Sequence, residues 1–224
     1  MKRQLIVIVA GLVLASFLAV SLASADTPGR LKEAAETLEA LLKIPEADKG
    51  IPQDLVKKAH CIVVVPSHKS AAFGVGGEYG RGFVACRQGS GWTAPAAIKV
   101  EGGSFGFQIG GSETEVVMLV MNEKGMNRLL TNKFTLGADA SVAAGPVGRS
   151  AKAKTDAAMT AEILSYSRSR GLFAGVSLSG ATLREDDSAN KDMYGKELTN
   201  KEILRGKVET SAAAKPFMSA LANL

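Results

Sequence analysis

The sequence is poor in the residues that most often carry catalysis and metal binding. Its 224 residues include two histidines, two cysteines and one tryptophan, and aromatic residues make up 5% of the chain. Two cysteines exclude a disulfide-dense scaffold, and the chain has neither the C-x-x-C nor the H-x-x-x-H spacing of a zinc site. With 46% hydrophobic and 22% charged residues, the chain belongs with globular proteins and not with disordered ones.

Two short matches to catalytic motifs lack the context that the chemistry requires. Gly102–Gly106 fits G-x-S-x-G, but a nucleophile elbow needs a following helix and a later histidine, whereas His60 and His68 both precede it. Gly80–Ala85 fits the loose dinucleotide fingerprint, yet turn-forming residues follow where a helix is required. We therefore predict no catalytic residue, no metal ligand and no cofactor, and a protein that is not an enzyme.

The N-terminus has the pattern of a secretory signal peptide. Lys2 and Arg3 precede an apolar run from Leu5 to Leu22, which ends in Ala23-Ser24-Ala25. We predict cleavage after residue 25, a single domain over 26–224, and export to the periplasm or the medium. The mature chain would carry 25 basic and 22 acidic residues, so its net charge falls from +5 to +3.

The two cysteines, Cys61 and Cys86, have two interpretations. In an exported protein they can form a disulfide, or each can be a small buried hydrophobic residue. The sequence leaves both open.

Helices are predicted mainly near the two ends of the chain. Thr27 and Pro28 begin an amphipathic pattern that runs to residue 44, and Pro52 begins a short helix to Lys58. Asn122 is typical of a helix N-cap. Near the C-terminus, short helices are expected over Asp186–Tyr194, Thr199–Arg205 and Ser211–Leu221, where the acidic cluster at 185–187 suits a helix start.

Between these helices the pattern favours strands. Ile62–Val65 is a short β-branched run before Pro66, and residues 71–111 hold 12 of the 24 glycines. Turns are predicted at 88–91 and at Gly102-Gly103, with strands over 104–109 and 116–121 and a hairpin that turns at Gly171 and runs to Leu183. The predicted fold class is α+β: a strongly coiled antiparallel sheet or partial barrel, covered by N- and C-terminal helices.

Basic residues are concentrated in one segment, and we predict that they bind anionic lipid headgroups. Aromatic residues are too few to suggest nucleic acid as a partner. The segment contains Arg149, Lys152, Lys154, Arg168 and Arg170.

Four segments in order resemble the SYLF domain, a lipid-binding domain also found in yeast and animal SH3-containing proteins linked to actin. They are Gly103–Gly110, Glu115–Asn122, Lys133–Arg149 and Tyr166–Leu178, and the resemblance extends over about residues 36–205. It implies a non-enzymatic phospholipid-binding domain; some family members bind phosphoinositides or actin.

This chain differs from the family at its N-terminus, where the helix over 27–44 is balanced in charge and not basic. We therefore expect a peripheral protein that binds anionic phospholipid through the basic residues of 149–170. The family's phosphoinositide specificity is not carried over to this chain, and the sequence does not identify the lipid. Actin is not expected as the partner of an exported protein. The alternative is a structural or protein-interaction module of the cell envelope.

Overall fold

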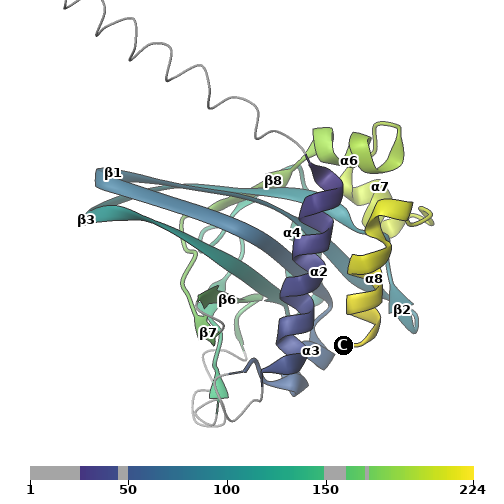
Figure 1. Cartoon of the computed structure of the whole chain (residues 1–224), viewed down its shortest axis with the longest axis horizontal. Coiled ribbons are helices and arrows are strands. Elements are labelled where there is room, and N and C mark those ends of the chain that lie inside the picture. The colour runs from purple at the N-terminus through teal and green to yellow at the C-terminus, as the bar shows by residue number, and fades with distance from the viewer. Residues whose placement is uncertain (1–25, 45–49, 149–159, 170–171) are drawn as a thin grey trace, which may run out of the picture.

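The computed structural model describes residues 26–44, 50–148, 160–169 and 172–224. Within these ranges the chain folds as α+β, with eight strands in a strongly curled, half-barrel sheet and helices from both ends of the chain packed on it (Figure 1). The predicted fold class is confirmed. No helix in the described part of the chain is both long and apolar enough to cross a membrane.

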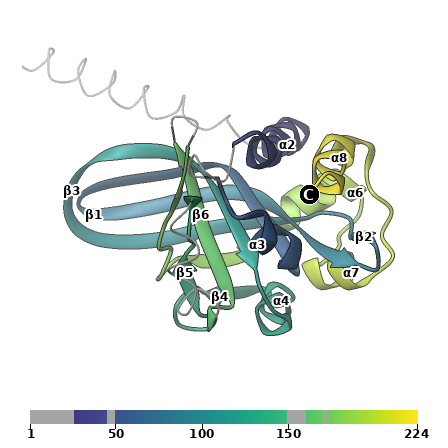
Figure 2. The same ribbon diagram turned by 90° about the horizontal axis from the view of Figure 1, so that it is seen from below.

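Two very long strands form the framework of the sheet. Strand β1 (Cys61–Gln88) pairs in antiparallel fashion with β3 (Ala96–Val120), from Cys61 opposite Val120 to Val84 opposite Ala96. The register shifts between Val65 and His68 and again between Phe73 and Gly74, and the ribbon doubles back on itself (Figure 2). The predictions that Pro66 ends a strand and that Gly102-Gly103 forms a turn are wrong, because both positions lie inside these strands.

Glycines allow the two halves of β1 to lie against each other. A Cβ atom on Gly82 would lie 2.0 Å from the backbone oxygen of Val64, and one on Gly80 would lie 2.6 Å from a Val65 methyl group. At the two ends of β1, the Arg87 amide donates a hydrogen bond of 2.8 Å to the His60 carbonyl, and a disulfide joins Cys61 to Cys86. We predicted from these glycines that the sheet is strongly coiled. In the structure they also allow two backbone segments to lie close together.

Shorter strands extend each half of the ribbon. The second half of β3 pairs with β6 (Ile163–Ser169), which also pairs with β7 (Leu172–Gly175) and, in parallel, with β5 (Val142–Ala144). The first half of β3 pairs with β8 (Thr182–Glu185), and β8 pairs with β4 (Lys133–Thr135). Strand β2 (Gly91–Trp92) closes the predicted turn after Gln88. The prediction of a single strand from 172 to 183 is wrong. This stretch forms β7, which pairs with β6, and the start of β8, which pairs with β3 and β4.

The helices agree with the sequence pattern. Helix α2 (Thr27–Lys43) packs against β1 and against the C-terminal helix α8 (Lys215–Ala222), although its N-cap is Asp26 and not Thr27. The others have the following bounds: α3 Gln53–Lys58, α4 Glu123–Leu129, α6 Asp187–Tyr194, α7 Asn200–Arg205 and the 3-10 helix η3 Ala212–Ala214.

Both faces of the ribbon bury apolar side chains. On one face, Leu31 and Leu38 of α2 pack with Phe83 and with Phe217 of α8, whose ring centroid lies 6.0 Å from that of Phe83. On the other face, strands β3, β4 and β8 form a second cluster with α7, which includes Ile98. Sequestering both faces explains the continuous apolar runs that flank the glycine-rich stretch.

His68 lies between the two halves of the ribbon and is 5% exposed. Its Nε2 has no hydrogen-bond partner among the described residues, although a carboxylate oxygen of Glu78 lies 3.5 Å away. Burial lowers the pKa of His68, and the charge of Glu78 offsets only part of this shift.

Adding one methyl group at Gly82 should destabilise the fold. Gly82→Ala would force apart the backbones of the two β1 halves, and we expect a loss of about 1–3 kcal/mol in the free energy of unfolding. Chemical denaturation measures this loss. The control is Gly91→Ala, because a Cβ atom there meets nothing within 4 Å. Equal stability of the two variants would contradict the close approach.

The position of His68 predicts a loss of stability at mildly acidic pH. Because its pKa is lower in the folded state, the unfolded state binds the proton more readily, and the free energy of unfolding should fall as pH drops below about 6.5. The limit is about 1.4 kcal/mol per pH unit. His68→Gln should remove this component in denaturation curves measured across that range. An identical pH dependence in the variant would rule out the assignment.

Candidate functional site

The structure locates only one residue of the predicted basic segment. Arg149, Lys152, Lys154 and Arg170 lie outside the described residues. Arg168 lies on β6 opposite Glu115 of β3, and its guanidinium makes a two-pronged ion pair with that carboxylate, with Nη2 2.5 Å from Oε1. The charge of Arg168 is therefore already compensated within the sheet.

A different set of basic residues is brought together by strand register. Arg81 of β1 is directly opposite Lys99 of β3, Lys99 is opposite Arg184 of β8, and Arg184 is opposite Lys133 of β4. Residues directly opposite each other share one face of a sheet, so the four side chains form one line across four neighbouring strands. We call this set the basic row.

The basic row lies on the face of the sheet that is turned away from the second apolar cluster. The residues that alternate with it on the same strands, Ile98, Leu183 and Phe134, are buried in the second apolar cluster. Side-chain exposure increases along the row from 13% at Arg81 to 27% at Lys99 and 51% at Arg184, and Lys133 is exposed. One end of the row is thus fixed in the structure and the other is open to solvent.

Asp186 holds the buried end of the row. This carboxylate caps α6 by accepting a hydrogen bond from the Ala189 amide, as the acidic cluster predicts, and it is 1% exposed. Its oxygens also lie 2.5 Å from Arg81 Nε and 3.3 Å from Lys99 Nζ. Burial alone would raise the pKa of Asp186, but hydrogen bonds from Arg81 and Ser188 and the two positive charges hold it below its usual value.

A fifth cation, Arg30 of α2, lies next to the buried end. Burial lowers its pKa, and so does the positive charge of Arg81. Its Nη2 donates a hydrogen bond of 3.2 Å to Thr27, at the start of the helix that follows Asp26. Helix α2 therefore begins beside the buried end of the basic row.

The exposed end of the row is only partly compensated. Arg184 lies 3.3 Å from Glu101, an exposed pair that contributes little to stability, and Lys133 forms no ion pair with any described residue. Four cations thus meet two carboxylates, Asp186 and Glu101. Like charges placed directly opposite each other destabilise a sheet. This arrangement favours an anion arriving from solvent.

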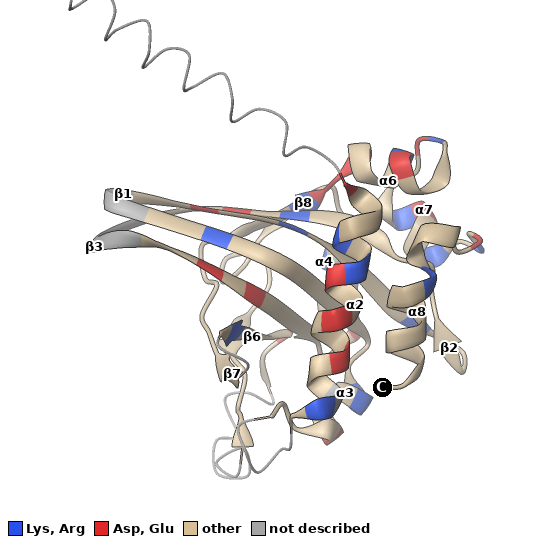
Figure 3. Cartoon of the chain, in the orientation of Figure 1, with Lys and Arg blue, Asp and Glu red and all other residues tan. Residues whose placement is uncertain are grey.

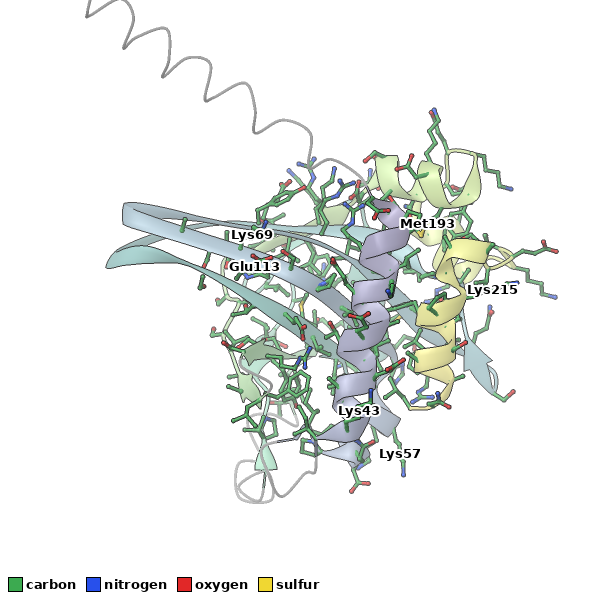
Figure 4. The ribbon with its side chains drawn as sticks, viewed as in Figure 1. Lys43, Lys57, Lys69, Glu113, Met193 and Lys215 are labelled. Carbon is green, nitrogen blue, oxygen red and sulfur yellow. A yellow bond between two sulfur atoms is a disulfide. The ribbon has the colours of Figure 1, made fainter. Side chains whose placement is uncertain are left out.

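The surface between α2 and the ribbon has the opposite charge. A cleft of about 570 Å³ lies there, and Figure 3 shows red along the middle of α2 and on β3. Lys69 lies 4.0 Å from Glu113 across the ribbon and is one of the few basic groups in this cleft (Figure 4). The acidic residues that line the cleft are Asp26, Glu33, Glu36, Glu113 and Glu115.

The described residues contain no group of three histidine, cysteine or carboxylate side chains that is close enough to hold a metal ion. What the site offers is a line of guanidinium and ammonium donors, which bind anions by charge and hydrogen bonds.

The basic row was missed by sequence reasoning because its members are isolated in the chain. Between Arg81 and Arg184 lie 102 residues, and the four cations meet only through three separate strand pairings. Local clustering pointed to 149–170 instead. The sequence shows only that each of these strands contributes a basic residue. It does not show that the residues are neighbours until the strand register is known.

Comparison with known proteins identifies relatives over most of the chain. Residues 101–224 match the family model of Ysc84, described as "Las17-binding protein actin regulator". The chain is 36% identical over 197 residues to "Protein YSC84" of Saccharomyces cerevisiae, an alignment that covers 85% of this chain and 42% of the relative. It is 33% identical over 195 residues to "SH3 domain-containing YSC84-like protein 1" of Rattus norvegicus, with 85% and 57% covered.

The chain spans about two fifths to three fifths of the length of these relatives, so the similarity concerns the shared domain. The family model matches more than half of the chain, and the identities exceed 30% over 85% of it. On this evidence the chain belongs to the Ysc84, or SYLF-domain, family.

Proposed function

We propose that this protein is an exported, non-enzymatic phospholipid-binding domain that docks peripherally on an anionic membrane surface in the periplasm or outside the cell. The basic row carries the proposal. Its four cations share one sheet face, become more exposed toward Arg184 and Lys133, and exceed their carboxylate partners by two. Each basic residue near an anionic surface contributes about 1 kcal/mol to binding at modest salt.

The position of the row suits a membrane surface better than a small soluble anion. Its cations belong to four strands, so they present a broad surface and not a single closed pocket.

Protein binding is the second candidate function, and the acidic cleft is the observation that favours it. A cleft lined by five carboxylates suits a basic segment of a partner protein. The family description names Las17 binding and actin regulation, which concerns the relatives. For an exported chain we do not propose actin, but an envelope protein with a basic segment would fit. Mass spectrometry of co-purified material distinguishes the two candidates, because the first predicts lipid and the second a protein.

Reversing charge at the exposed end of the row should abolish docking. Lys133→Glu combined with Arg184→Glu removes two attractive charges and adds two repulsive ones. We expect at least about a 30-fold loss of partitioning to phosphatidylglycerol vesicles in flotation assays at low salt. Raising the salt concentration should weaken wild-type binding.

The matched control reverses the same total charge elsewhere. Lys57 of α3 and Lys215 of α8 are exposed and lie away from the row (Figure 4). Lys57→Glu with Lys215→Glu should therefore retain most of the binding. Equal loss in both double variants would mean that net charge alone drives docking, and equal recovery of wild type with neutral and anionic vesicles would reject the electrostatic proposal.

A further inference from the structure

A hollow at the open end of the basic row has charges of both signs. It has a volume of about 530 Å³ and is formed by β1, β3, β4, β8 and the loop before β8. Lys133 and Arg184 lie on the β4–β8 side, and Glu101, Glu78 and Tyr79 lie on the β1–β3 side. Arg184 and Glu101 meet as an ion pair of 3.3 Å, with Lys133 beyond Arg184 and Tyr79 beyond Glu101.

The carboxylate side is unsuited to a purely anionic ligand. Glu101 has a side-chain exposure of 39%, and its carboxylate lies on the same face as Arg184 and Lys133. Glu78 points to the opposite face of β1, where its carboxylate lies 3.5 Å from His68 Nε2. The carboxylate of Glu101 would repel a second phosphate but attract an ammonium group.

Tyr79 adds an aromatic surface on the same side. It is 45% exposed, one of two large hydrophobic side chains that are exposed among the described residues. Its register partner is Glu101, so a phenol ring and a carboxylate lie next to each other on one face. An aromatic ring beside a carboxylate is an arrangement that binds cations.

We propose that this hollow binds the headgroup of a zwitterionic aminophospholipid, the phosphoethanolamine of phosphatidylethanolamine. The phosphate lies against Lys133 and Arg184, and the ammonium lies between Glu101 and the Tyr79 ring. A primary ammonium is preferred over the quaternary ammonium of choline, because only the primary ammonium donates hydrogen bonds to the carboxylate. The inference deepens the proposed membrane docking: the basic row supplies attraction to the surface, and the hollow selects the headgroup.

Vesicles that share one fraction of phosphatidylglycerol test this selectivity. The remainder is either phosphatidylcholine alone or a mixture in which phosphatidylethanolamine replaces part of it. We expect wild type to partition about two- to fivefold more strongly onto the vesicles with phosphatidylethanolamine, the range of an exposed cation–π contact and ion pair. Glu101→Gln should remove this preference and at the same time strengthen binding to phosphatidylglycerol, because it removes the carboxylate that partly compensates Arg184.

Glu113→Gln is the matched control. Like Glu101, Glu113 is a carboxylate of β3 with a basic partner, here Lys69. It should keep the preference. Equal binding to both vesicle types by wild type, or an equal effect of both glutamine variants, would overturn the inference. If the wild-type protein binds neither vesicle type, the proposed docking on anionic membranes is rejected, and not only the headgroup preference.

A soluble ligand gives a readout that depends on neither docking nor a variant. Glycerophosphoethanolamine added to the wild-type protein should shift the backbone amide NMR signals of Gly102, Gly103 and Gly180, which line the hollow. Glycerophosphocholine should shift them less at the same concentration. Equal shifts, or none with either compound, would reject the aminophospholipid site even if anionic vesicles bind.

Discussion

The close approach of the two halves of β1 is the constraint on which the rest of the structure depends. At Gly82 the backbone of one half lies so near Val64 of the other that no side chain fits between them. Interiors packed at this density transmit strain, so the doubled ribbon has little freedom to adjust. The disulfide between Cys61 and Cys86 joins the two ends of the same strand. The positions of all other strands follow from this ribbon.

The doubled ribbon also determines where charge lies. Because β3 turns back with β1, its first half faces β8 and its second half faces β6. Lys99 of the first half therefore lies between Arg81 of β1 and Arg184 of β8. Acidic residues of the second half, Glu113 and Glu115, contribute instead to the cleft near α2. The curvature of the ribbon thus places a basic row and an acidic cleft on different parts of the same sheet.

Features fixed by local geometry could be predicted from the sequence, and features fixed by distant contacts could not. The side chains of Asn122 and Thr199 each accept a hydrogen bond from the amide three residues later, so the starts of α4 and α7 could be predicted from the sequence. The length of β1 was not, because Pro66 and the glycines weaken a strand unless another part of the chain lies against it. The basic row could not be predicted for the same reason, because strand register depends on contacts between distant parts of the chain.

Asp186 links the fold and the candidate site in one residue. It begins α6, and it compensates Arg81 and Lys99, so the buried half of the basic row is held by the same carboxylate that positions a helix. A cation held in this way is not available to a ligand. Arg184 and Lys133 lie farther along the row, where the remaining carboxylate is solvent-exposed and contributes little. An anion from solvent would therefore bind at the open end of the row, because Asp186 already compensates the positive charges at the buried end.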